Sequence, residues 1–451
     1  MNIDLKLKPA DLKGAIDRLF ALSAEKIRSI EESLKPGSAA PVFTAAGRYT
    51  SRGWTEWTQG FQFGAAILQF DATGDAWFLE AGRTRTVEHM ASHVTHIGVH
   101  DHGFNNVSTY GNLVRLMNEG RIPENAWERR FYEMALKCSG AVQAARWSNT
   151  RDGGYIYSFN GPHSLFVDTI RTIRALGVSH LLGHALLGEN DRKISLLDRL
   201  ILHAQSTARY SVFYGEGRDI YDIRGRAVHE CVFNTNDGNY RCPSSQQGYA
   251  PFSTWTRGLA WATCGFPEEL EYLEQVGDAE LEAHGGRAQV TAWMRKAAEA
   301  TCDFYIDNAT ASDGIPYWDT GAPNLYKLGD WQSRAAEPFN DYEPVDSSAA
   351  AIAAQGLLRL GRYLKNERYW QAGLTVARSL FAEPYLSTDS KHQGLILHSV
   401  YHRPNGWDAV PAGQRVPAGE SSMWGDYHAR ELALYLKRTI EGGPYLTYFG
   451  R

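Results

Sequence analysis

A stretch rich in histidine, residues 89–104 (HMASHVTHIGVHDHGF), holds the densest set of chemically active side chains in the sequence. His89, His93 and His96 are spaced to share one face of a continuous helix, and imidazole is a common zinc ligand. The HExxH zinc motif is absent, however, because Glu88 precedes the first histidine. A glycine also interrupts the helical pattern after the third. We therefore expect these three histidines on a helix away from the functional cleft, and no catalytic metal.

Asp101 lies between His100 and His102, in a turn flanked by glycines. A carboxylate on a loop that follows a helix, next to aromatic residues, is a catalytic candidate. The alternative is that Asp101 caps the next helix. Both interpretations fit the residue pattern.

Asp168 follows a loop of glycine, asparagine, proline and histidine, and it begins an apolar helical pattern. Apolar neighbours such as Leu165, Val167 and Ile170 would desolvate its carboxylate. Desolvation raises a carboxyl pKa, which a general acid at neutral pH requires. Helix capping is again the alternative. Two aspartates on loops at one opening can divide the acid and base roles.

Aromatic and polar residues alternate in residues 246–266 (QQGYAPFSTWTRGLAWATCGF), which include Gln247, Trp255 and Arg257. Such rings can stack on a sugar, and a guanidinium can bind a sugar carboxylate through two parallel hydrogen bonds. Residues 52–64 add Trp54, Trp57, Phe61 and Phe63. The chain holds 13 Trp and 23 Tyr. This usage fits a saccharide cleft, with a large aromatic core as the alternative.

Helical periodicity recurs along the chain, separated by loops rich in glycine, proline and aromatic residues. It predicts helices over residues 76–94, 127–147, 194–208, 347–364 and 368–381, with Ser347 or Ser348 as the N-cap of the fourth. Residues 227–233 and 394–402 have strand-like patterns. No βαβ alternation and no Rossmann or P-loop glycine pattern is present. We expect stacked helical hairpins in one domain over residues 1–451, with 1–45 as an N-terminal helix and lead-in loop.

Composition excludes several classes of function. The net charge of −5 and the absence of Lys/Arg runs argue against a nucleic-acid partner. No apolar window is long enough for a membrane span, and residues 1–20 lack the apolar region of a signal peptide. The five cysteines are odd in number and scattered, which favours free thiols in a reducing compartment. We therefore expect a cytoplasmic protein without nucleic-acid or membrane partners.

These motifs resemble those of the unsaturated glucuronyl hydrolases, family 88 of the glycoside hydrolases, from about residue 50 to about residue 436. The matching stretches are W-T-x-G-F at 57–61, H-D-x-G-F at 100–104, the aspartate at 168, Q-G-Y, S-x-W-x-R-G-x-A-W and G-F within 247–266, P-Y-W-D from 316, D-S-S-A-A-A-I from 346 and W-G-D-Y from 424. The resemblance implies an all-α fold, the (α/α)6 barrel, which agrees with the hairpin pattern. It implies no cofactor.

The family removes a 4,5-unsaturated uronic acid from the non-reducing end of oligosaccharides released by polysaccharide lyases. Protonation of C4 of the vinyl ether places oxocarbenium character at C5, where water adds. The hydrated sugar then opens and releases its aglycone. The reaction needs a proton donor and a positioned water, but no nucleophile at the anomeric carbon, unlike ordinary glycosidases. The substrate implied for this chain is an acidic unsaturated oligosaccharide.

By this resemblance, Asp168 is the general acid/base and Asp101 is a second essential carboxylate. The remaining matched positions line the substrate site: Trp57, Phe61, His100, Phe159, His229, Gln247, Trp255 and Arg257.

The chain departs from the family pattern at several positions. Gln59 replaces the aspartate of the first motif, and Leu259 replaces the glutamine of R-G-Q-A-W. Arg171 and Arg174 interrupt the apolar run that usually follows the catalytic aspartate, and the chain has extra residues around 214–230 and 270–290. These changes suggest a divergent branch that acts on an unusual uronide.

Three other functions fit parts of the pattern. A sugar isomerase or epimerase on an (α/α) barrel works through histidine pairs, and a polysaccharide lyase on a similar toroid needs a Tyr/His or Arg constellation. The third is a non-catalytic saccharide-binding protein. The order of the motifs argues against the isomerase, and the presence of both aspartates argues against the binding protein.

Overall fold

The computed structural model describes residues 1–35, 37–53 and 57–450, so Trp54 of the predicted aromatic set lies outside the described residues. The helices are α1 Lys13–Ser33, α2 Gln59–Thr73, α3 Ala76–His89, α4 Ala91–Thr95, α5 His102–Asn105, α6 Asn112–Asn118, α7 Ala126–Ala145, α8 Thr169–Thr172, α9 Arg174–Leu181, α10 Leu196–Ser206, α11 Thr256–Leu273, α12 Asp278–Leu281, α13 Gly286–Phe304, α14 Ser347–Leu364, α15 Glu367–Leu380 and α16 Met423–Glu441. The strands are β1 Pro41–Ala45, β2 Arg48–Ser51, β3 Trp147–Thr150, β4 Gly153–Ile156, β5 Ser164–Phe166, β6 Leu186–Leu187, β7 Lys193–Ile194, β8 Glu230–Phe233 and β9 Tyr240–Ser244.

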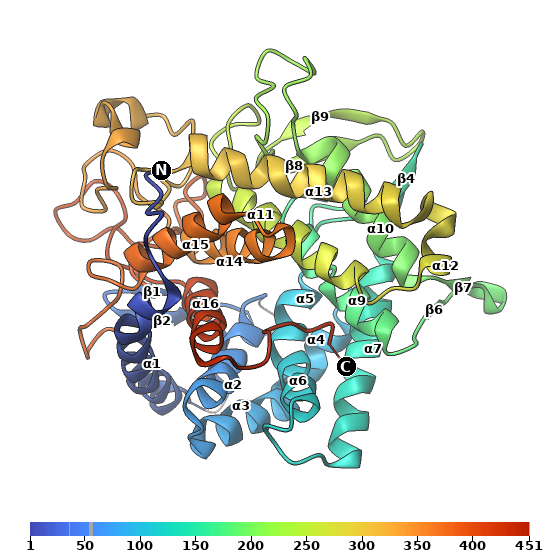
Figure 1. Cartoon of the computed structure of the whole chain (residues 1–451), viewed down its shortest axis with the longest axis horizontal. Helices are drawn as coiled ribbons and strands as arrows, with labels where there is room; N and C mark the ends of the chain where they lie inside the picture. The colour runs from blue at the N-terminus through green and yellow to red at the C-terminus, as the bar shows by residue number, and fades with distance from the viewer. Residues whose placement is uncertain (36, 54–56, 451) are drawn as a thin grey trace.

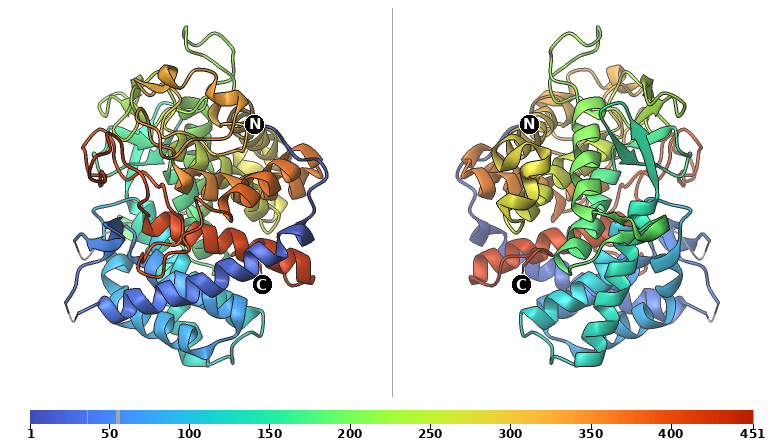
Figure 2. Two further views of the ribbon diagram at one scale, coloured as in Figure 1. Left: turned by 90° about the vertical axis from the view of Figure 1, so that its left-hand side faces the viewer. Right: turned by 90° about the vertical axis from the view of Figure 1, so that its right-hand side faces the viewer.

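The longer helices of the described ranges form six hairpins that close into a ring (Figure 1). The inner helices are α2, α6, α9, α11, α14 and α16, and each packs against an outer helix. Helix α1 lies along α16, so the N-terminal part of the chain completes the outer layer (Figure 2). This arrangement is the predicted (α/α)6 barrel. The strands form short antiparallel sheets in the loops: β1–β2, β3–β4, β5–β8–β9 and β6–β7.

The inner helix α14 shows how the sequence specifies the ring. Its N-cap is Asp346, whose side chain accepts a hydrogen bond from the backbone N–H of Ser348 at 3.1 Å. The predicted cap at Ser347 or Ser348 is therefore wrong, because both serines already have helical backbone and Asp346 has the extended backbone of a cap. Small residues then let α14 approach α11 closely. A Cβ at Gly356 would lie 2.0 Å from the carbonyl oxygen of Thr263.

The other predicted elements are partly confirmed. The helices predicted over 127–147 and 368–381 are α7 and α15, and the strand predicted over 227–233 contains β8. The predicted helix over 194–208 begins later, at Leu196, because Ile194 lies in β7. The predicted strand over 394–402 is wrong. This stretch makes only isolated bridges, from Ile396 to Leu386 and from Leu397 to Ser421.

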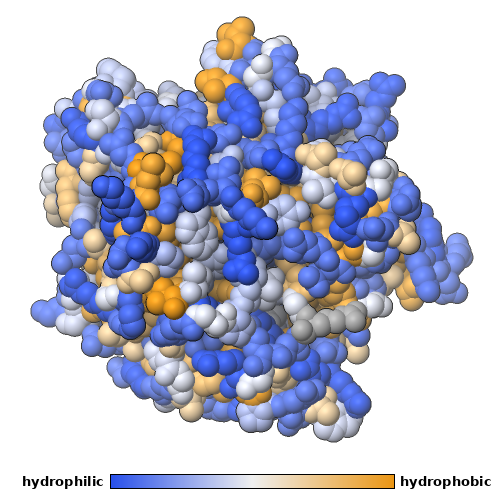
Figure 3. Space-filling view, viewed as in Figure 1, coloured by the Kyte–Doolittle hydropathy of each residue, from blue (hydrophilic) through white to orange (hydrophobic). Residues whose placement is uncertain are grey.

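The surface seen in Figure 3 is mostly hydrophilic, with its apolar residues in small separate groups. Within the described ranges, every helix is too short or too polar to cross a lipid bilayer.

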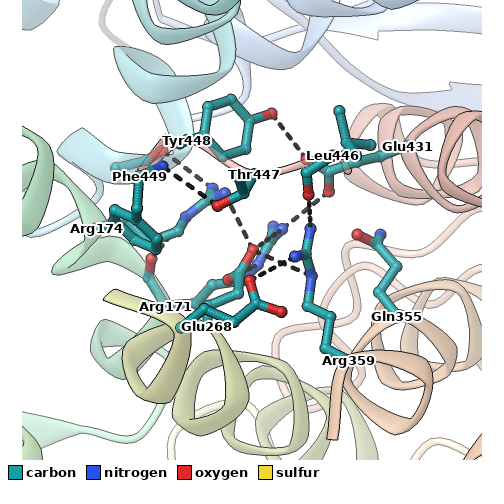
Figure 4. A network of polar contacts seen from close by, with 12 residues as sticks. Arg171, Arg174, Glu268, Gln355, Arg359, Glu431, Leu446, Thr447, Tyr448 and Phe449 are labelled. Atoms are coloured by element: carbon teal, nitrogen blue, oxygen red, sulfur yellow. Dashed lines mark hydrogen bonds and ion pairs between the residues drawn. The ribbon is translucent and has the colours of Figure 1, made fainter. Parts of the chain in front are cut away.

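A network of buried charges joins α8, α9, α11, α14 and α16 (Figure 4). Arg171 binds Glu268 of α11 at 2.9 Å and Glu431 of α16 at 2.8 Å, and its side chain is fully buried. Arg174 lies 3.4 Å from the same Glu268. Burial by itself would raise the pKa of both glutamates, but the facing arginines hold these pKa values below the ordinary range. The two arginines that interrupt the apolar pattern are therefore paired structural charges.

The C-terminal segment also contacts this network. It follows α16 and crosses the end of the ring in Figure 1. The carbonyl oxygen of Leu446 accepts a hydrogen bond from Arg359 at 3.0 Å, and the Tyr448 hydroxyl donates to Glu431 at 2.9 Å. Arg359 also binds Glu271 at 2.8 Å. Every charged group of the network thus has a partner, as a low-dielectric interior requires.

We predict that Arg171→Met destabilises the fold by about 3–5 kcal/mol, because Glu268 and Glu431 would lose the cation that compensates them. Urea unfolding measures the change. Arg295→Met is the matched control, since Arg295 pairs with Glu299 while 52% exposed, and surface pairs contribute little. Equal stability of the two variants would contradict the assigned role of the network.

Candidate active site

A cavity of about 410 Å³ opens at the end of the barrel where the inner helices begin, a volume typical of small-molecule sites. Its walls come from the segments just before α2, α5, α8 and α11 and from the loop between α15 and α16. The structure brings eight of the ten predicted site residues into this lining: Trp57, His100, Asp101, Phe159, Asp168, Gln247, Trp255 and Arg257.

The two remaining predicted residues lie behind the wall. Phe61 is fully buried and packs edge-on against Trp57, with ring centroids 5.9 Å apart. His229 is 2% exposed and packs against Trp255, with centroids 4.8 Å apart. Neither of them lines the cavity, and both support residues that do. Their contact with substrate stays a prediction.

The two aspartates meet at a single nitrogen atom. The Nε2 atom of His100 lies 3.2 Å from the Asp168 carboxylate and 3.7 Å from that of Asp101. Both aspartates occupy the position before a short helix, but neither side chain makes a capping hydrogen bond. The helix-cap alternative is therefore wrong for both residues. Their carboxyl groups face the histidine and the cavity.

The surroundings of the two carboxyl groups give them different pKa values. Burial raises the pKa of Asp101 to about 6, although His100 opposes the shift. Burial also acts on Asp168, but the hydrogen bond and the charge of His100 outweigh it and lower the pKa of Asp168. The pKa of His100 rises, because the two facing carboxylates outweigh its burial. The predicted increase in the pKa of Asp168 is thus wrong. Of the two carboxyl groups, Asp101 keeps its proton to the higher pH, up to about 6.

His229 positions the segment that carries Gln247. Its Nδ1 atom accepts hydrogen bonds from the backbone N–H groups of Gln246 and Gln247, at 3.0 and 3.3 Å. Burial lowers the pKa of His229 to about 4, so the ring is neutral at physiological pH and Nδ1 can accept. Replacement of this histidine would free the loop next to Asp168.

The terminal N–H groups of the Arg257 guanidinium already donate hydrogen bonds to protein acceptors in this structure. Its Nη1 atom donates to Asp346 at 3.2 Å and to the carbonyl oxygen of Val400, and its Nη2 atom donates to Gln247 at 3.1 Å and to the carbonyl oxygen of Tyr401 at 2.8 Å. The four terminal N–H donors of the guanidinium are therefore engaged. In this structure the arginine joins α11, α14 and the 400–401 loop and holds Gln247. The two-pronged grip on a substrate carboxylate stays a prediction, and it requires some of these hydrogen bonds to be exchanged for bonds to the substrate.

The histidine-rich stretch divides into two parts. Helix α3 ends at His89 and α4 ends at Thr95, so the predicted continuous helix is wrong and the three histidines do not share one face. His93 is buried in α4, whereas His96 lines the cavity. The prediction that all three lie away from the cleft is therefore wrong for His96. Over the described residues, no group of three His, Cys, Asp or Glu side chains could hold a metal ion.

Sequence patterns did not indicate one wall of the cavity. It consists of Arg52, after β2, and of Tyr401, His402 and Trp407, in the loop before α16. The guanidinium of Arg52 lies over the Trp407 ring, 4.8 Å from its centroid. The available signal is the glycine and the tryptophan of residues 402–407 (HRPNGW), but the strand-like pattern of residues 394–402 hides the start of this loop.

The departures from the family pattern lie outside the cavity. Gln59 donates to Gln62 at 2.7 Å within α2, and Leu259 is fully buried in α11. Arg171 belongs to the buried charge network. None of the three lines the cavity, so any effect on the substrate has to be indirect.

No family model matches the chain. It is 27% identical over 413 residues to the unsaturated glucuronyl hydrolase of Bacillus sp. (strain GL1), covering 89% of this chain and 91% of that protein. It is 24% identical over 389 residues to the unsaturated glucuronyl hydrolase of Formosa agariphila, covering 85% and 80% respectively. The chain is a distant relative of the unsaturated glucuronyl hydrolases. A crystal structure of an unsaturated glucuronyl hydrolase specific for heparin has the same fold, with a TM-score of 0.72, 18% identity, and coverage of 95% of this chain and 98% of that one.

In this relative of the unsaturated glucuronyl hydrolases, the buried carboxyl of Asp101 predicts a pH-dependent stability. Its pKa in the folded protein, about 6, lies above its ordinary value of 3.8. The stability that its protonated form contributes is therefore present at low pH and is lost as the pH rises through about 6. Asp101→Asn keeps the shape without the charge, and should stabilise the protein by about 1–3 kcal/mol at pH near 7.5 and by clearly less near 4.5. Thermal unfolding at the two pH values measures this, and a variant less stable than wild type near pH 7.5 would contradict it.

Proposed function

We propose that this protein is a glycosidase that removes a 4,5-unsaturated uronic acid from the non-reducing end of oligosaccharides produced by polysaccharide lyases. The observation that carries the proposal is the convergence of Asp101 and Asp168 on His100 in one cavity. Aromatic side chains surround these groups, as in a site that binds a sugar ring. The names of the relatives point to the same activity.

The reaction requires a proton at C4 and a water molecule at C5. The proton adds to the C4=C5 vinyl ether, positive charge develops at C5 and the ring oxygen, and water attacks C5 while a base takes one of its protons. The hemiketal then opens, and the C1 hemiacetal that remains releases the aglycone. A site for this chemistry needs one protonated and one ionised group close together. Asp101 and Asp168 have these two states at pH values below about 6, where Asp101 keeps its proton and the lowered pKa of Asp168 keeps that group ionised.

We assign the delivery of the proton to Asp168 and its supply to Asp101. The two carboxyl groups contact the same Nε2 atom of His100, so a proton can pass from this nitrogen to Asp168 while Asp101 replaces it. The three groups then act as one unit that shares protons. After delivery, the Asp168 carboxylate is the base that accepts the proton of the attacking water.

The aromatic wall orients the sugar. Trp57 and Trp255 both line the cavity, and Trp57 is fixed by a stacked contact with Trp424, with centroids 4.9 Å apart. Phe159 lies over the His100 ring, with centroids 6.1 Å apart. A ring bound between these groups would place its double bond next to the carboxyl cluster.

Three broader assignments belong to the same proposal. The whole chain acts as one catalytic domain, with residues 1–45 supplying the outer helix α1 and strand β1. The chain is a divergent member of family 88 of the glycoside hydrolases. It works in the cytoplasm, which agrees with its five free cysteines, three of them buried.

The test is the incubation of the purified protein with unsaturated uronyl disaccharides from several lyase digests. A hydrolase removes the ultraviolet absorbance of the conjugated C4=C5 uronate and releases the second sugar. A lyase would instead create this absorbance from the intact polysaccharide, and an isomerase or a binding protein would leave it unchanged. The double variant Asp101→Asn/Asp168→Asn is the control for contaminating activity.

We predict different kinetic effects for the two aspartates. Asp168→Asn should lower kcat by about 10²–10⁴-fold over the whole pH range, because the group that reaches C4 cannot release a proton. In wild type, kcat/KM should fall as the pH rises through about 6, where Asp101 loses its proton. In Asp101→Asn, this alkaline limb should move to lower pH, since the pKa of Asp168 is lowered.

The pH profiles also distinguish the alternative assignment of the acid. If Asp101 itself protonated C4, Asp101→Asn would abolish the alkaline limb instead of shifting it. An active Asp168→Asn enzyme would remove Asp168 from the mechanism.

A further inference from the structure

The two arginines that line the cavity differ in what they bind. The terminal donors of Arg257 are engaged by protein acceptors. Arg52 contacts aromatic rings instead. Its guanidinium lies 4.8 Å from the centroid of Trp407 and 5.4 Å from that of Tyr401. Among the described residues, these two rings are the side-chain contacts that the structure gives for Arg52.

The stacked geometry leaves Arg52 able to bind an anion. A guanidinium held against a ring uses its flat face, so the N–H donors at its edge stay available. These donors form a planar fork that matches a sulfate or a carboxylate. Two of the three histidines of the lining offer little competing positive charge, because burial lowers the pKa of His402 to about 4 and that of His96 below its ordinary value. The third, His100, faces the carboxylates of Asp101 and Asp168.

The exposure of the side chains in the cavity indicates which sugar ring of the substrate Arg52 contacts. Asp101 and Asp168 are 7% and 6% exposed, so the reacting uronate has to occupy the inner part of the cavity. Arg52 is exposed, and Trp407 is 45% exposed. The sugar attached to the uronate therefore extends toward Arg52 and the Trp407 ring.

We propose that Arg52, stacked on Trp407, binds an anionic substituent, a sulfate or a carboxylate, on the sugar that is linked to the unsaturated uronic acid. This inference rests on the proposed function and adds a preference for substrates with a second negative charge. It assigns Arg52 to the specificity of the reaction and leaves the proton transfer to Asp101, His100 and Asp168.

The experiment compares wild type and Arg52→Gln on three unsaturated disaccharides whose second sugar is uncharged, sulfated or carboxylated. Wild type should have a lower KM for at least one of the anionic substrates than for the uncharged one. Arg52→Gln should raise this KM about tenfold, as expected for the loss of one charge-assisted contact. It should leave kcat and the uncharged substrate nearly unchanged. Higher salt should weaken the anionic preference of wild type.

Two matched variants sharpen the comparison. Arg48→Gln removes an exposed arginine of β2 that does not line the cavity, and its kinetics should equal those of wild type. Arg52→Lys keeps the charge without the planar fork, and should recover only part of the preference. Equal losses on all three substrates, or no loss on any, would overturn the assignment of Arg52 while the proposed function stands. A wild-type protein that cleaves none of them would overturn the proposed function itself.

Discussion

The fold depends on the compensation of charges that are buried inside the ring. Arg171 lies about one helical turn after Asp168. It binds α11 through Glu268 and α16 through Glu431. Such groups are costly to remove from water, and only complete pairing makes the burial tolerable. The geometry of the pairs therefore fixes how α8 sits against its neighbours. The position of Asp168 therefore follows from the pairs of Arg171 with Glu268 and Glu431, which are fully buried (Figure 4).

The same constraint explains why the cavity can be preorganised although loops build it. The inner helices α2, α11, α14 and α16 begin at one end, so the segments before them meet there. Arg257 then joins these segments, since it binds Asp346 at the start of α14 and two carbonyl groups of the 400–401 loop. Donors that are already engaged do not have to be ordered when substrate binds, which lowers the cost of reaching the reactive geometry.

Sequence patterns predicted stacked helical hairpins, which depend on local signals, and the family resemblance implied the closed barrel and most of the residues that line the cavity. Periodic apolar residues indicated the helices, and the motifs before them contain Asp101, Asp168 and Trp255. The patterns failed where the role of a residue depends on contacts with residues far away in the sequence. The roles of Arg257 and Arg171 depend on partners about 90 residues or more away, and the pKa order of the two aspartates depends on His100. The wall at Arg52 and Trp407 joins two distant loops with no periodic pattern, so its formation could not be predicted from either loop alone.

The charges in the cavity connect substrate binding to the readiness of the acid. Before binding, His100 faces an ionised Asp168, which is a stable arrangement but a poor proton donor. An unsaturated uronate brings a negative charge and expels water from the cavity. Both effects favour the protonated form of a nearby carboxyl group. The arrival of the anionic ring thus shifts the shared proton toward Asp168 when a C4 atom is present to receive it. A neutral sugar would lack this effect, so the charge of the substrate contributes to catalysis as well as to recognition.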